Sequence, residues 1–196
     1  MVQDAEKPSR KPRADSIRNR ELLLEAAKAV FSAGGSGASL EAVARAAGVG
    51  IGTLYRHFPT RDALFEAVYR REVEQLSDLA ASLAASAPPE EALRRWLHAT
   101  VELAATKRGM LAALELAAEG RAELYAYSSD RMQAAAGTLV SRARTAGAIR
   151  DDLSAEEMLR AVLGLVGAWY RSGTPGWQDT VRRLVDVFVD GMRAGA

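Results

Sequence analysis

Few side chains in this sequence are of the types that carry out catalysis. The 196 residues include no cysteine and only two histidines, His57 and His98, and they contain no glycine-rich phosphate loop or clustered carboxylate motif. A Ser-His-Asp site would have to use His98, which lies in an ordinary amphipathic helical pattern, and His57 has no second metal ligand nearby. We therefore expect that the protein is not an enzyme and that it has neither a metal site nor a cofactor.

Hydrogen-bonding side chains gather instead in one short segment. Four of them lie on a helix predicted from Ile51 to about His57, namely Thr53, Tyr55, Arg56 and His57. A second short helix is predicted from Leu40 to about Ala46, and the run Gly48-Val49-Gly50 between them is short enough only for a tight turn. Such a pair can place its second helix in the major groove of DNA, where these groups suit phosphates and base edges.

The remaining elements are predicted to be helical as well, so the expected fold is all-α with about nine helices. A longer helix, about Asp15 to Ala33, precedes the short pair and completes a three-helix core. Thr60 is placed to cap a long fourth helix that reaches about Ser86. Five more helices are expected at about 90–107, between Gly109 and Gly120, at 121–146, at 155–172 and from the 173–176 loop to about Met192.

Charge is distributed unevenly along the chain. Residues 1–61 hold ten Lys/Arg against six Asp/Glu, a net charge of +4, and residues 62–196 hold sixteen against nineteen, a net charge of −3. A basic end suggests a polyanionic partner, although ordinary scatter is an alternative on charge alone. Residues 1–14 are polar and basic, which predicts a disordered arm. With no secretory signal, no long apolar run and no cysteine, a cytoplasmic location is expected.

Two stretches carry a resemblance to a known family. RELLLEAAKAVFSAGG, from Arg20, and SLEAVARAAGVGIGTLYRHFPTRDALFEAV, from Ser39, resemble the N-terminal domain of the tetracycline-repressor (TetR) family of bacterial regulators. The resemblance is nearly continuous over residues 18–68. It implies a helix-turn-helix head at 15–60 and a divergent helical domain at 61–196 for ligand binding and dimerisation, joined by the long fourth helix.

The resemblance also implies roles for residues of the head. Ser39 would cap its helix and touch phosphate, and Arg56 would read a base or bind phosphate. Gly50 departs from the family pattern, because Ser or Thr often stands there as cap and contact. Leu54 and Phe58 are expected in the core. The expected DNA-contacting set is Ser39, Gly50, Ile51, Gly52, Thr53, Tyr55, Arg56, His57 and Arg61.

The last two predicted helices carry apolar stripes. In the resembled family these helices pair with their symmetry mates, so a homodimer is expected through Val162, Val166, Val181, Leu184, Val185, Phe188 and Met192. The alternative is that they are core helices of a monomer.

The preceding helices are expected to enclose a pocket for a small-molecule effector. Its apolar lining would come from Trp96, Met110, Leu114, Tyr125, Met132 and Trp169, with Glu115, Tyr127 or Arg131 as polar groups, although each of them could equally pack or face solvent. We expect a ligand-responsive regulator, most simply a repressor released from a palindromic operator. A ligand-blind DNA-binding protein is the rival hypothesis.

Overall fold

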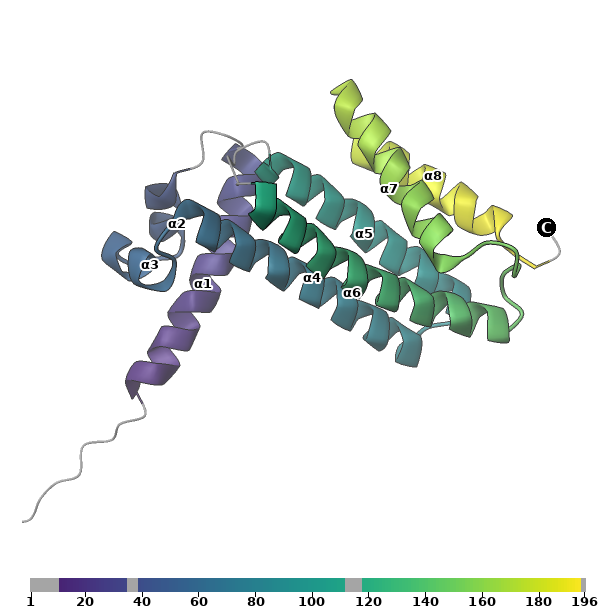
Figure 1. Ribbon diagram of the computed structural model, residues 1–196, viewed down its shortest axis with the longest axis horizontal. Helices are drawn as coiled ribbons and strands as arrows, with labels where there is room; N and C mark the ends of the chain where they lie inside the picture. Colours follow the sequence, from purple (N-terminus) through teal and green to yellow (C-terminus); the bar gives the residue numbers. More distant parts are fainter. Residues whose placement is uncertain (1–10, 35–38, 112–117, 195–196) are drawn as a thin grey trace, which may run out of the picture. The chain divides into compact units, whose positions relative to one another are not determined.

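The computed structural model describes residues 11–34, 39–111 and 118–194, and within these ranges it contains eight helices and no strand (Figure 1). The helices are α1 (Lys11–Gly34), α2 (Leu40–Ala46), α3 (Ile51–His57), α4 (Arg61–Ser86), α5 (Pro89–Leu111), α6 (Ala118–Thr145), α7 (Ala155–Ser172) and α8 (Trp177–Gly191). None of them has the length and apolar character needed to cross a membrane.

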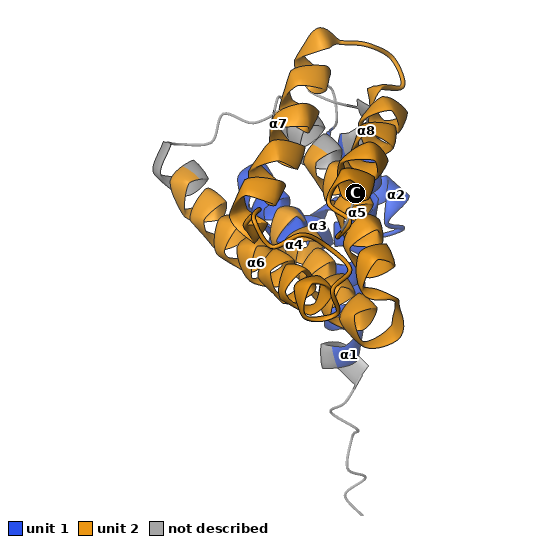
Figure 2. Ribbon diagram, turned by 90° about the vertical axis from the view of Figure 1, so that its right-hand side faces the viewer, with its two compact units in different colours: residues 1–68, 112–114 blue, residues 69–111, 115–196 orange. Residues whose placement is uncertain are grey.

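The chain divides into two compact units, coloured in Figure 2. The first comprises residues 1–68 and 112–114, and the second comprises residues 69–111 and 115–196. Their boundary at Val68 and Tyr69 falls inside α4, eight residues beyond the boundary expected at residue 60. The first two turns of α4 therefore belong to the head.

The head is held together by an apolar core to which all four of its helices contribute. Its fully buried side chains include Leu23, Leu24, Val43, Leu54, Leu64 and Phe65. The Ser39 hydroxyl accepts a hydrogen bond from the Ala42 amide at 3.1 Å, which caps α2. Gly48 takes a φ of +68° in the turn between α2 and α3, a conformation that side chains with a Cβ rarely adopt. These local features fix the short helix pair at the predicted bounds.

The second unit packs α5 against α6, α7 and α8. The Trp96 indole is fully buried, and its N–H donates to the Leu76 carbonyl at 3.0 Å, which joins α5 to α4. Ser154 and Glu157 form the expected capping box at the start of α7. Gly173, with a φ of +66°, ends that helix.

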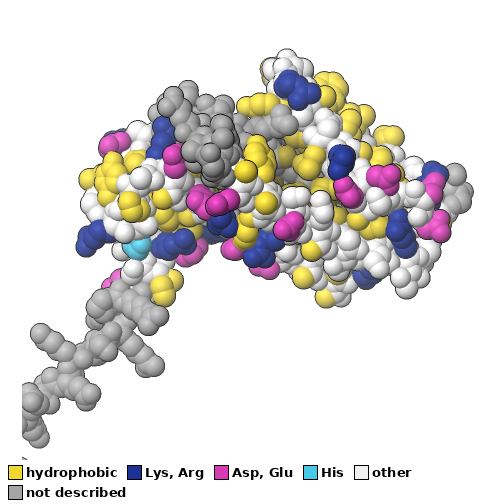
Figure 3. Space-filling model, in the orientation of Figure 1, with side chains coloured by type: hydrophobic (Ala, Val, Ile, Leu, Met, Phe, Trp, Pro, Cys, Tyr) yellow, Lys and Arg dark blue, Asp and Glu magenta, His cyan; other side chains and the backbone are white. Residues whose placement is uncertain are grey.

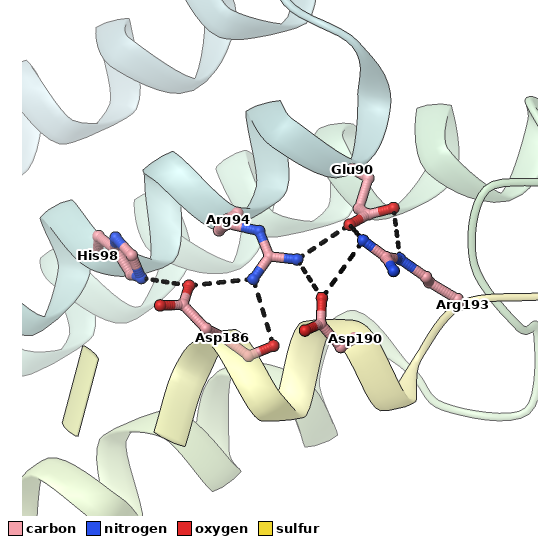
Figure 4. Close-up of polar contacts among 6 residues, drawn as sticks. All are labelled: Glu90, Arg94, His98, Asp186, Asp190 and Arg193. Atoms are coloured by element: carbon pink, nitrogen blue, oxygen red, sulfur yellow. Dashed lines mark hydrogen bonds and ion pairs between the residues drawn. The ribbon is translucent and has the colours of Figure 1, made fainter. Parts of the chain in front are cut away.

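An ionic network joins α5 to α8 and to the residues that follow it, and its members are Glu90, Arg94, His98, Asp186, Asp190 and Arg193 (Figure 4). Arg94 bonds to Glu90 at 2.9 Å, to Asp186 at 3.0 Å and to Asp190. The hydrogen bond from Arg193, with help from Arg94, holds the pKa of Glu90 below its ordinary value against the effect of partial burial. The Arg94 guanidinium thus bridges three carboxylates on two helices.

Three expectations about the helices are corrected. Helix α1 begins at Lys11, so residues 11–14 of the expected disordered arm are helical, and residues 1–10 lie outside the described residues. Helix α5 continues past Gly109 to Leu111, and α6 already includes Gly120. The helix boundaries predicted at these two glycines are therefore wrong, and residues 112–117, which would form most of the predicted short helix, are outside the described part. A helical glycine destabilises by only about 1 kcal/mol, which helix-favouring neighbours can offset.

Candidate nucleic-acid interface

Helix α3 presents one buried and one exposed side. Leu54 and the following Phe58 are buried, as expected, whereas Ile51 and Tyr55 are 39% and 46% exposed. Tyr55 carries a phenolic hydroxyl that can donate or accept a hydrogen bond. Gly50 and Gly52 are exposed as well, and Thr53 and His57 are half-buried. Several of the residues predicted to contact DNA are therefore accessible on one side of α3, among them Ile51, Gly52 and Tyr55.

Packing within the chain does not require glycine at either of the two glycine positions near the start of α3. A Cβ added at Gly50 or Gly52 would meet no atom within 4 Å, and neither residue has a positive φ. Gly50 provides no side-chain cap, so α3 begins without the hydrogen bond that Ser39 gives α2. The open space beside Gly52 allows another molecule to approach the backbone closely.

Arg56 lies back along its own helix. Its Nε donates to the Gly52 carbonyl at 3.2 Å, and its Nη2 donates to the Thr53 hydroxyl at 3.2 Å. Both contacts are exposed, so the guanidinium can exchange them for a phosphate or a base edge. The sequence prediction treated Thr53 and Arg56 separately, although their i, i+3 spacing was a signal that they touch.

Two further arginines stack on aromatic rings of the head. The Arg61 guanidinium carbon lies 5.6 Å from the centroid of the Phe31 ring, and its buried Nη2 has no hydrogen-bond partner among the described residues. The Arg20 guanidinium carbon lies 5.3 Å from the centroid of the Phe58 ring. Both distances are typical of cation–π contacts. Arg61 was predicted from the sequence as a DNA contact, whereas Arg20 was not, because its contact with Phe58 depends on tertiary packing.

Several arginines of the head have no carboxylate partner among the described residues. Within the described residues, five arginines of the head form no ion pair with a carboxylate, namely Arg18, Arg20, Arg45, Arg56 and Arg61. In the second unit Arg94, Arg150, Arg160, Arg182 and Arg193 are paired with acids, whereas Arg95, Arg142, Arg171 and Arg183 form no ion pair among the described residues either. Lys and Arg side chains flank the histidine on the visible face of the head (Figure 3). Unpaired cations around an exposed helix form an electrostatic footprint for a polyanion.

The residues expected to line a ligand pocket occupy different environments. Trp96 and Met132 are buried, Trp169 is half-buried, and Tyr125 is 48% exposed. The side chains of Met110, Leu114 and Glu115 are outside the described part of the structure.

The two remaining polar candidates lie in a surface cluster with α4. The Tyr127 hydroxyl donates to Glu74 at 2.8 Å, and the guanidinium carbons of Arg70 and Arg131 lie 4.3 and 4.6 Å from the centroid of its ring. A buried polar pair lies nearby along the same helices, at Tyr69 and Ser128. Burial raises the pKa of Tyr69 to about 12, although a hydrogen bond with Ser128 opposes the shift. This pair was not predicted from the sequence.

Most residues expected at a dimer interface are buried inside the protomer. Val162, Val166, Val181, Val185 and Met192 pack in the core of the second unit, which corrects their assignment to a surface between protomers. An amphipathic stripe reveals a buried face without revealing what covers it. Leu184 and Phe188 are half-buried and remain accessible in part. Two neighbours that were not expected, Leu163 and Val187, are 36% and 69% exposed.

Comparisons with known proteins agree with this architecture. Residues 23–68 match the family model described as "Bacterial regulatory proteins, tetR family", and residues 88–194 match the model "Transcriptional regulator SbtR-like, C-terminal domain". The TetR transcriptional regulator SCO0520 from Streptomyces coelicolor is 41% identical in sequence, with a TM-score of 0.78 over 90% of this chain and 99% of that chain.

Two further relatives have informative names. The HTH-type transcriptional repressor Rv1474c from Mycobacterium tuberculosis is 28% identical over 77% of this chain and 79% of its own length. The TetR-like regulator LfrR from Mycobacterium smegmatis, solved in complex with proflavine, is 25% identical with a TM-score of 0.61 over 88% of this chain and 96% of that chain.

The fold and the cationic helix-turn-helix head define a DNA-binding transcriptional regulator. The chain belongs to the TetR family of bacterial regulatory proteins, whose members are non-enzymatic.

Proposed function

We propose that the chain is a homodimeric repressor that binds a palindromic operator and is released from it by a small-molecule effector. The observation that carries the proposal is the exposed face of α3, where Tyr55 and Arg56 are accessible and no carboxylate among the described residues neutralises the arginines. The relative named as a repressor supports the direction of regulation. A DNA partner implies a site of action in the bacterial cytoplasm.

An exposed apolar patch supports the homodimer. The patch consists of Leu163 on α7 with Leu184, Val187 and Phe188 on α8, two helices that pack against each other. Val181, Val185 and Val189 of α8 are already buried within the protomer, so covering the exposed side chains of the patch does not require that core to rearrange. A twofold axis through the patch would supply two reading heads, which matches the symmetry of a palindromic site.

The effector is proposed on the strength of the family relative that holds proflavine. The second unit of the chain has buried aromatic and thioether side chains, Trp96 and Met132, on the helices expected around such a site. Linkage then requires reciprocity, because a ligand that weakens DNA binding tenfold must itself bind tenfold more weakly to the DNA complex. Equal ligand affinity with and without saturating operator would contradict regulation and would favour a ligand-blind DNA binder.

The experiment that tests DNA recognition is selection from a random duplex library by the purified protein, followed by sequencing of the bound fragments. An inverted repeat is expected. Tyr55→Phe should then weaken binding to the selected site by about 1 kcal/mol, or roughly fivefold, through one lost hydrogen bond to phosphate. Bound fragments with no enriched sequence, or a Tyr55→Phe variant that binds the selected site with full affinity, would count against DNA recognition by α3.

A further inference from the structure

The first turns of α1 extend past the core of the head. The first buried residue of α1 is Leu23, and the side chains from Ala14 to Leu22 are exposed, apart from the half-buried Asn19. Residues 11–22 span about 18 Å of helix at 1.5 Å per residue, and Figure 1 shows them running beyond α2 and α3. This part of α1 therefore adds exposed helical surface to the head.

Arg20 stands where this extension meets the end of α3. In helical register it lies three and four residues before Leu23 and Leu24, so it continues the stripe that faces the core. Its guanidinium lies over the ring of Phe58, the residue that directly follows α3. Stacking occupies the face of the guanidinium and leaves its N–H edge available. Among the described residues no carboxylate is paired with it.

We propose that Arg20 binds a phosphate of the DNA duplex, and that α1 thereby adds a contact surface beside the helix-turn-helix. The inference rests on the proposed DNA binding by α3. A helix seated in a major groove about 12 Å wide has a phosphate backbone on either side. The Arg20 guanidinium, held 5.3 Å from the Phe58 ring, stands at the end of that helix, on the side where one of these backbones would run. The Phe58 ring orients Arg20 before binding, which reduces the side-chain entropy lost on contact.

Three substitutions separate this contact from a structural role. Arg20→Met removes the charge but keeps an apolar chain over Phe58, and Arg20→Lys restores a charge. Arg18→Met is the matched control, because it removes the same charge from the same helix two residues away, on the opposite side. The probe is a random-sequence duplex of about 30 base pairs, with binding to the full chain measured by fluorescence anisotropy between about 50 and 200 mM salt. Melting curves confirm that each variant is folded at the assay temperature.

Arg20→Met is expected to reduce the slope of log affinity against log salt by about 0.9 for each engaged subunit, and to weaken binding at 0.1 M salt about eightfold for each engaged subunit. Arg20→Lys should recover most of the slope, and Arg18→Met should change it far less. Equal effects at Arg18 and Arg20 would overturn the proposal in favour of a diffuse charge effect. A lower melting temperature with an unchanged slope would overturn it in favour of a purely structural stacking role.

Failure of this inference can be told apart from failure of the proposed function. If Arg20→Met binds like wild type while Tyr55→Phe is weakened on its selected site, α1 makes no contact and α3 still does. If the wild-type chain shows no salt-dependent DNA binding at all, both proposals fall.

Discussion

Replacing Arg94 with methionine tests how α8 is held against α5. The substitution keeps an unbranched apolar chain but leaves Glu90, Asp186 and Asp190 without the guanidinium that bridges them. Glu90 retains Arg193, and Asp186 retains His98, so the network is weakened rather than abolished (Figure 4). We expect a folded protein with lower stability.

The size of the effect follows from how exposed each contact is. The Arg94 side chain is 18% exposed and its Glu90 partner 25% exposed, so this sheltered contact contributes about 1 kcal/mol. The carboxylates of Asp186 and Asp190 are more exposed and contribute about 0.5 kcal/mol each. The sum is about 2 kcal/mol. At about 2–4 °C per kcal/mol for a protein of this size, the melting temperature should fall by about 4–8 °C.

Thermal unfolding followed by circular dichroism measures this shift. Arg160→Met is the control, because Arg160 pairs with Glu156 on the surface of α7 with a side chain that is 79% exposed, and its loss should lower the melting temperature by only about 1 °C. Salt near 1 M shortens the Debye length to about 3 Å and should narrow the Arg94 deficit by screening the carboxylates left behind. A shift at Arg94 no larger than at Arg160 would refute the network as a stabilising feature.

Two further predictions concern the same helices. Arg193 and Arg94 lower the pKa of Glu90, so the stability that Glu90 contributes is complete above the ordinary carboxyl pKa of 4.5 and is lost as the pH falls through the lowered value. Glu90→Gln should therefore make the free energy of unfolding fall less steeply with pH on the acid side of its maximum. An unchanged acid side of the curve would be inconsistent with this linkage. Val187→Asp should convert the dimer to monomers with unchanged helicity, since the side chain is 69% exposed in the protomer; sedimentation that gives a wild-type monomer, or a dimer that survives the change, would remove the α7–α8 patch as the interface.

The head was the most predictable part of the fold because its boundaries are set by local chemistry. Ser39 caps α2, Gly48 provides the left-handed turn, and Pro59 follows the end of α3, so sequence neighbours alone determine where these helices begin and end. Helix ends were also predicted at Gly109 and Gly120, but both residues lie inside helices, because glycine lowers helix stability without forcing a helix to stop.

Contacts between distant residues could not be predicted from spacing. Arg20 meets Phe58 only because the fold of the head brings this part of α1 to the residue that follows α3, and Glu90 meets Arg193 across 103 positions of sequence. The stripe of α8 was visible as a pattern, but periodicity does not distinguish burial within a chain from burial between chains. Val181 and Val185 therefore had to be reassigned to the protomer core once the packing of α7 and α8 was known.

The empty space beside Gly52 sets two selective pressures against each other. Because a Cβ there would meet nothing within the chain, alanine at this position should make α3 more stable by about 1 kcal/mol. The same methyl group would project toward whatever approaches the exposed start of the helix. Selection for thermostability and selection for operator affinity should therefore favour different residues at position 52, whereas at Gly48 the positive φ makes both favour glycine.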